Sequence, residues 1–375
     1  MANNVSNGVL KINPNDYYIC KVFELPREDF RDAVVNYMRK MAAVEWECSE
    51  NFGMEVKWEH WGVDLAYRKG EIYRGMPYTG LIVSLDQFKE LIVDGKYTTD
   101  QKDWKKSPGV NCFTAVMHST QQVECTCLLT WDIFPHEYEN PPMKLVGEYT
   151  LIEDAGSTHQ VTELNGIDVM CKAYAQLQKG DVIGWKNHPK GYNFTHYRII
   201  TEEPIIVRDE NGKIDPEKST VKCIEQTNKF DTDRTDGVKT TWRIDKAYTL
   251  QSLFDKSYLP VTLYNYEKPR DEVELPYICL EKEIKAEELE KRTFGDNAVR
   301  SNFPIRYVRI RVYNQEGEEV LSKTKGDMAR TFEVNLEEGF AESVASLEKG
   351  KYTLKLDGGL ARGNVDFAKV EFEIK

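Results

Sequence analysis

The sequence predicts an α+β fold in which helices and an antiparallel sheet are followed by a smaller, all-β domain. Apolar residues recur at helical spacing through the first 180 residues, and short β-branched segments replace them from about residue 181. After about residue 265, apolar and polar residues alternate, as in strands with one buried face. We therefore expect two domains in the 375 residues, over 1–265 and 266–375.

Helices are predicted in the first domain where apolar positions fit a 3.6-residue repeat. Phe30, Val34 and Met38 have this spacing, and acidic residues follow Pro26 where the helix would begin. Ser84 is a suitable N-cap for a second helix. The predicted helices cover residues 27–47, 84–94, 112–120 and 165–178.

Strands are predicted where the segments become short and rich in β-branched residues. Asn211 and Gly212, in the turn 209–213, form the dipeptide that most strongly indicates a tight hairpin. Short strands joined by such turns favour an antiparallel sheet, on which the helices would pack. The predicted strands cover residues 181–185, 195–201, 204–209 and 219–226.

The second domain is predicted to be a small antiparallel β-sandwich of immunoglobulin-like size, ~100 residues. Its alternating segments are separated in places by Gly-containing turns. The charged stretch 280–292 is interpreted as a solvated linker or helix that leads into it. The predicted strands cover residues 305–314, 317–323, 330–336, 350–357 and 366–375.

Composition excludes some classes of partner and leaves the compartment open. The 50 basic and 62 acidic residues give a net charge of −12, so we expect no nucleic-acid partner. No apolar run approaches the ~20 residues of a membrane span. The first residues do not have the pattern of an export signal. Several of the eight cysteines lie in apolar segments, and we expect most of them to be reduced.

Cys112, His196 and Glu225 form a candidate catalytic group. Cys112 begins a predicted helix, and the exposed amides and dipole at a helix N-terminus favour the thiolate form of a cysteine. His196, on a predicted strand, would exchange protons with the thiol. Glu225, on a later strand, would orient the imidazole if the two strands lie side by side, and Gln226 would then point to the other face.

Purely structural roles for the same residues remain open. A cysteine before an apolar helix is often a packed small side chain, and a single strand histidine is often structural. Cys125 is an alternative nucleophile and His188 an alternative base. Cys125 and Cys127 are flanked by His118 and His136, but their spacing does not match a zinc site, so no metal is expected.

An aromatic-rich stretch lies near the proposed site in the sequence. Its rings could stack on sugar rings, although packing in the core is the simpler interpretation. No glycine-rich phosphate-binding motif is present, and we expect no cofactor. The aromatic residues are Trp58, Trp61, Tyr67, Tyr73 and Tyr78.

The segment GVNCFTAV (109–116) resembles the nucleophile motif Gly-x-Asp-Cys-Ser-x-x-Val of the NlpC-type cell-wall endopeptidases, which are papain-like cysteine hydrolases. KAYAQLQKGDVIGW (172–185) is similar to their segment entering the sheet, and THYRIIT (195–201) to their histidine strand. IEQTN (224–228) resembles the acidic strand of the related CHAP amidohydrolases. PYTG (77–80) resembles the element whose tyrosine binds the oxyanion. The resemblance covers roughly residues 30–265.

The resemblance implies a papain-like hydrolase domain that cleaves a peptidoglycan stem-peptide bond through a thioester on Cys112. The backbone N–H of Cys112 and the hydroxyl of Tyr78 would hold the oxyanion, and we place Asn111 and Gln226 beside them at the oxyanion and substrate side. The C-terminal sandwich would bind a glycan, a surface or the catalytic domain.

Two departures from the family pattern keep other functions open. Asn111 stands where the family has Asp, and Phe113 stands where it has Ser. One alternative is therefore an inactive relative that acts as a glycan- or surface-binding protein. Another is an acyltransferase or an amidase acting on a different amide.

Overall fold

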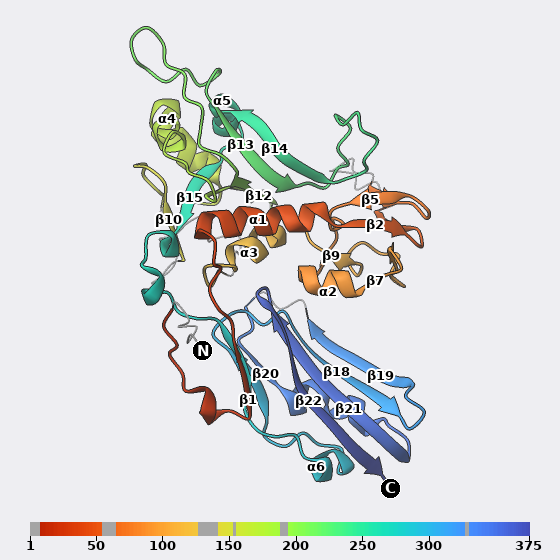
Figure 1. Cartoon of the computed structure of the whole chain (residues 1–375). Helices are drawn as coiled ribbons and strands as arrows, with labels where there is room; N and C mark the ends of the chain where they lie inside the picture. Colours follow the sequence, from red (N-terminus) through yellow and green to blue (C-terminus); the bar gives the residue numbers. More distant parts are fainter. Residues whose placement is uncertain (1–7, 55–64, 127–141, 153–154, 188–193, 327–329) are drawn as a thin grey trace. The chain divides into compact units, whose positions relative to one another are not determined.

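The computed structural model describes residues 8–54, 65–126, 142–152, 155–187, 194–326 and 330–375 (Figure 1). The chain forms two compact units, residues 26–267 and residues 1–25 together with 268–375. The boundary after residue 267 lies close to the expected one. The described part of residues 1–25 nevertheless belongs with the C-terminal unit, because β1 (Ile19–Val22) pairs with β16 (Tyr277–Leu280). The fold is mixed α+β, as predicted.

Unit 26–267 contains a six-stranded antiparallel sheet in the order β10-β15-β11-β12-β13-β14. Three of the four strands predicted for this region are present. The fourth, 204–209, makes only isolated bridges, through Ile205 and Arg208. The strands are β10 (Met143–Leu145), β11 (Val182–Asn187), β12 (Phe194–Ile200), β13 (Thr220–Gln226), β14 (Trp242–Thr249) and β15 (Leu259–Leu263).

The helices of this unit pack against the sheet and against each other. α1 (Phe30–Ala43) contacts α3 (Cys112–Thr120), and α3 lies against β12 and β13. α4 (Thr158–Tyr174) contacts β11, β15 and α5 (Leu250–Asp255) (Figure 1). The sequence places α4 over 165–178. It begins earlier, and Gly166, with φ of 73°, bends it where the predicted helix would start.

Residues 45–110 add small sheets that the sequence analysis does not predict. They enclose an aromatic core in which the rings of Trp46 and Tyr73 stack 4.9 Å apart, and those of Phe52 and Tyr67 4.6 Å apart. Tyr67 and Tyr73 therefore pack in the core, while Trp58 and Trp61 lie outside the described residues. The elements are β2 (Glu45–Cys48), β3 (Phe52–Met54), β4 (Leu65–Tyr67), β5 (Ile72–Arg74), β6 (Leu81–Ile82), α2 (Leu85–Glu90), β7 (Ile92–Val93), β8 (Lys96–Tyr97) and β9 (Pro108–Gly109).

The C-terminal unit consists of two four-stranded antiparallel sheets, β1-β16-β17-β20 and β19-β18-β21-β22. It is not all-β as expected, because it also holds α6 (Ala286–Glu290) and α7 (Leu336–Ala345). The strand expected over 330–336 is reduced to β20 (Glu333–Asn335), and Asn335 caps α7. The other strands are β17 (Ala298–Ser301), β18 (Tyr307–Asn314), β19 (Glu319–Gly326), β21 (Gly350–Leu360) and β22 (Gly363–Ile374).

One pair of cysteines is oxidised, whereas most of the cysteines were expected to be reduced. Cys20 of β1 and Cys279 of β16 lie opposite each other in the sheet and form a disulfide. Cys48, Cys112, Cys171 and Cys223 are free thiols. Within the described ranges, no helix has the length and apolar character needed to cross a membrane.

Candidate active site

Cys112 is the first residue of α3, and its neighbours cap the helix. Thr114 donates its N–H to the Asn111 side chain at 3.0 Å, and Asn111 donates its N–H to the Thr114 hydroxyl at 2.9 Å. The N–H of Cys112 donates to none of the residues described. An anion at this end of the helix could therefore accept a hydrogen bond from it. Asn111, expected at the substrate side, acts as the N-cap.

His196 of β12 lies beside Cys112. The thiol sulfur of Cys112 is 3.8 Å from the backbone carbonyl of Thr195, the residue before His196. Nε2 of His196 hydrogen-bonds a carboxylate oxygen of Glu225, which leaves Nδ1 as the ring nitrogen that can meet the thiol. Burial lowers the pKa of His196, but the charges and hydrogen bonds of Cys112 and Glu225 outweigh burial and raise the pKa to about 9.

Glu225 of β13 is buried, and both of its carboxylate oxygens accept hydrogen bonds. Its side chain is 2% exposed, and one oxygen accepts from His196 and, at 2.8 Å, from Nε of Arg198. The other oxygen accepts from the Tyr248 hydroxyl. Burial raises the pKa of Glu225, but its bonds to His196 and the charges of His196 and Arg198 hold the pKa well below its usual range. Glu225 is thus an ionised acceptor that can orient the imidazole.

A β-bulge lies next to Glu225 in the pairing of β13 with β14. Cys223 pairs with Lys246 and Glu225 with Arg243, so β14 has one more residue than β13 between these two pairs. Asp245 lies in this bulge and has a φ of 54°. Bulges often redirect side chains beside functional sites. The carboxylate of Asp245 pairs with Arg39 of α1 at 2.7 Å, which links the bulge to that helix.

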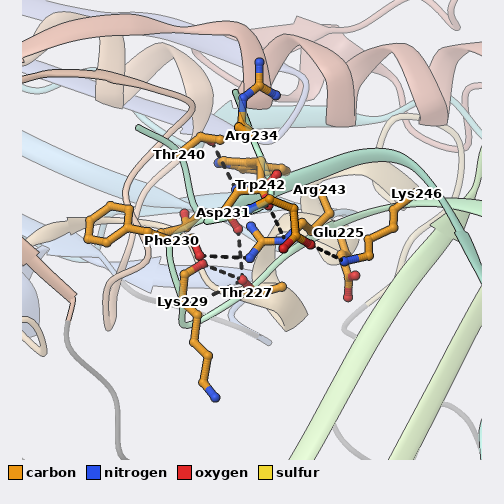
Figure 2. A network of polar contacts seen from close by, with 12 residues as sticks. Glu225, Thr227, Lys229, Phe230, Asp231, Arg234, Thr240, Trp242, Arg243 and Lys246 are labelled. Atoms are coloured by element: carbon orange, nitrogen blue, oxygen red, sulfur yellow. Dashed lines mark hydrogen bonds and ion pairs between the residues drawn. The ribbon is translucent and has the colours of Figure 1, made fainter. Parts of the chain in front are cut away.

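The loop after β13 folds back onto β14. Figure 2 shows Arg243 with its guanidinium directed at this loop, where it donates to the carbonyl of Phe230 at 3.0 Å and pairs with Asp231 at 3.3 Å. Asp231 also donates its backbone N–H to the carbonyl of Thr240. These contacts fix the end of the strand that carries Glu225.

Tyr78 reaches the site because its segment runs alongside the residues before Cys112. Thr79 donates its N–H to Val110, and Val110 donates its N–H to Pro77. A Cβ on Gly109 would lie 2.5 Å from the carbonyl oxygen of Pro77, so only glycine allows this approach. Burial, together with the charge and hydrogen bond of Cys112, raises the pKa of Tyr78 well above its usual value, so its hydroxyl stays protonated.

Gln226 does not lie where a substrate could reach it, which differs from the sequence expectation. The side chain is fully buried, and its amide nitrogen donates to the carbonyl of Met76 at 2.9 Å. Trp242 donates its indole N–H to the same carbonyl, also at 2.9 Å. Gln226 therefore supports the segment that leads to Tyr78, on the face of β13 opposite to that of Glu225.

The alternative site residues are placed less favourably or lie outside the described ranges. Cys125 follows α3 instead of beginning it, so it lacks the helix N-terminal position that Cys112 has. Cys127, His136 and His188 are outside the described residues. His118 is buried within α3. Among the residues that the structure describes, no group of three or more His, Cys, Asp or Glu could hold a metal ion.

Three residues of the site, namely Arg198, Tyr248 and Tyr258, are not assigned by the sequence analysis. The centre of the Arg198 guanidinium lies 3.8 Å from the Tyr248 ring centroid and 4.6 Å from that of Tyr258. Arg198 could have been found, because it follows His196 by two residues and strand alternation puts both on one face. Nothing local in the sequence indicates that Tyr248 and Tyr258 meet it.

The site thus combines a thiol at a helix N-terminus, an imidazole and a buried carboxylate, with a tyrosine hydroxyl nearby. Comparisons of this chain with protein-family models, curated proteins and solved structures found no match.

Proposed function

We propose that the chain is a cysteine-dependent amide hydrolase with a papain-like catalytic domain, residues 26–267, and a C-terminal β-sandwich. One observation supports this most: the thiol of Cys112, at the start of a helix, interacts with His196, whose other nitrogen is bonded to the buried Glu225. Thiol, base and orienting carboxylate are the three groups that nucleophilic cysteine catalysis needs.

In the proposed reaction the proton of Cys112 moves to Nδ1 of His196, and the thiolate attacks the amide carbon. The backbone N–H of Cys112 and the Tyr78 hydroxyl stabilise the oxyanion. The C–N bond breaks, and His196 returns its proton to the leaving amine. His196 then takes a proton from water, and the hydroxide attacks the thioester carbon. The C–S bond breaks, the carboxylic acid leaves, and His196 returns its proton to the sulfur of Cys112.

The resemblance to NlpC-type peptidases supports a peptidoglycan stem peptide as the substrate. The departure at Phe113 is compatible with an intact site, because its ring packs 5.9 Å from that of Tyr197, on the face of β12 opposite to His196. A glycan contact through the C-terminal unit remains part of the proposal. No cofactor is required by this mechanism.

A non-catalytic glycan- or surface-binding protein is the second candidate. It is favoured by the low exposure of Cys112, 7%, which leaves little of this residue open to a substrate. This candidate predicts an unreactive Cys112 and a ligand affinity that is insensitive to its substitution.

The test is release of free amine from purified peptidoglycan stem-peptide fragments, followed by mass spectrometry. The wild type is compared with Cys112→Ser and with Cys171→Ala, a control at a buried cysteine of α4 outside the site. We expect cleavage by the wild type and the control and at least a ~1,000-fold loss in Cys112→Ser. Full cleavage by Cys112→Ser would overturn the proposal. No cleavage by the wild type, with intact glycan binding, would favour the second candidate.

A further inference from the structure

Arg198 and His196 share a single oxygen of Glu225. Nε of Arg198 donates to Oε2 at 2.8 Å, and Nε2 of His196 bonds the same atom. Both side chains extend from one face of β12, two residues apart. The position of that oxygen, and so of the imidazole, therefore depends on where Arg198 is held.

Two tyrosines hold Arg198. Its guanidinium packs on the ring of Tyr248 at 3.8 Å and on that of Tyr258 at 4.6 Å, distances typical of cation–π contacts. Tyr248 also donates its hydroxyl to the second oxygen of Glu225. One tyrosine therefore fixes both the cation and the carboxylate, and each carboxylate oxygen has at least one donor.

The charges of the cluster explain why a permanent cation is needed. Burying an ionised carboxylate costs free energy unless a cation pairs with it. An imidazole alone would lose its charge in each turnover. Arg198 remains charged throughout, since a guanidinium does not deprotonate in proteins. Its side chain is 12% exposed, so water screens the pair with Glu225 only weakly.

We propose that Arg198, held by Tyr248 and Tyr258, is a positioning residue that keeps Glu225 ionised and fixed against Nε2 of His196, so that Nδ1 stays directed at Cys112. The inference rests on the proposed function, because it assigns a role within that site. A lysine could supply the charge, but neither the planar stacking nor the directed Nε–H.

The test is the alkylation rate of Cys112 by iodoacetamide between pH ~5 and ~9, followed by mass spectrometry of the full chain. The variants are Arg198→Met, Arg198→Lys and Tyr248→Phe. The matched control is Arg309→Met in the C-terminal unit, where Arg309 pairs with the buried Asp357 at 2.7 Å. Denaturant unfolding reports the stability of every variant.

We expect Arg198→Met to slow alkylation roughly 10-fold or more near pH 6. The defect should shrink toward pH 9, because Glu225 without its cation protonates more readily in acid and releases the imidazole. Arg198→Lys should recover part of the rate, and Tyr248→Phe should lose only about threefold because Arg198 and His196 still bind Glu225. Arg309→Met should lower stability and leave the rate unchanged.

An Arg198→Met protein that is folded and alkylated at the wild-type rate at every pH would overturn the inference, because Arg198 would then be structural only. If Arg198→Met does not fold, wild-type pH profiles for both Arg198→Lys and Tyr248→Phe would overturn it equally. The proposed function fails separately, if Cys112 of the wild type reacts no faster than Cys171.

Discussion

Glu225 of unit 26–267 and Asp357 of the C-terminal unit are both buried carboxylates that pair with arginine, and the two clusters differ in their remaining partners. Asp357 of β21, 5% exposed, is paired with Arg309 at 2.7 Å and with Arg311 at 3.2 Å. Glu225, 2% exposed, is paired with one arginine and one histidine. Both carboxylates are therefore neutralised by two nitrogen-bearing side chains from a neighbouring strand.

The difference lies in whether a partner can exchange a proton. Both partners of Asp357 are guanidinium groups, which stay charged at any physiological pH, so this cluster can only hold the sheet together. Glu225 replaces one guanidinium with the imidazole of His196, which the thiol of Cys112 contacts. A buried ion pair thus becomes a candidate catalytic group when one permanent charge is exchanged for a titratable one.

Replacing each of the two acids by its amide should have the largest effect and should distinguish the two clusters most clearly. Glu225→Gln and Asp357→Asn should each lower the free energy of unfolding by roughly 3–5 kcal/mol, since each leaves a partly buried guanidinium without its acid. Only Glu225→Gln should also slow Cys112 alkylation, by roughly 10- to 100-fold at pH 7. Equal rates for the two variants, measured by mass spectrometry, would show that the Glu225 cluster is structural as well.

Gly109→Ala would test whether Tyr78 belongs to the site. The new Cβ would lie 2.3 Å from the Thr79 hydroxyl and 2.5 Å from the Pro77 carbonyl, so the segment with Tyr78 must move away from Cys112. We expect a loss of about 1–3 kcal/mol in stability and a roughly 10-fold slower hydrolysis. Gly156→Ala is the control, because its nearest contact would be Gln160 at 3.8 Å, and both values should stay unchanged.

The pH dependence of stability is the smallest effect that we expect, and it comes from His196. Its pKa is raised from 6.5 to about 9. The stabilisation from protonated His196 is therefore fully present below pH ~6.5 and is lost as pH rises through ~9. The free energy of unfolding of His196→Ala, measured by thermal unfolding near pH 6, should be lower than that of the wild type by on the order of 1–3 kcal/mol. A difference that grows above pH 9 would contradict the raised pKa.

Local sequence signals predicted the start of the candidate site. Cys112 was expected to begin a helix after the turn at 109–111, and it is the first residue of α3; the strand expected over 195–201 is β12, which carries His196. The pattern Asn335-x-x-Glu338 is a helix-capping signal, and it begins α7 at the end of the segment where alternation predicts a strand.

Contacts between distant segments could not be predicted. The strand expected at 204–209 is reduced to isolated bridges, and Ile205, whose β-branched side chain favours a strand, is exposed. Gln226 supports the backbone of Met76 150 residues away. The pairing of β1 with β16, which moves the N-terminal residues into the C-terminal unit, likewise depends on tertiary structure alone.

The relative alkylation rates of the cysteines test the central claim most directly. Burial raises the pKa of Cys48 and Cys171 to about 11 and that of Cys223 to about 12, so these thiols should hardly react at pH 7. We predict that iodoacetamide labels Cys112 at least ~100-fold faster than these three, and that His196→Ala removes the advantage. Labelling of Cys112 that is as slow as that of Cys171, or equally fast in His196→Ala, would contradict the proposed site.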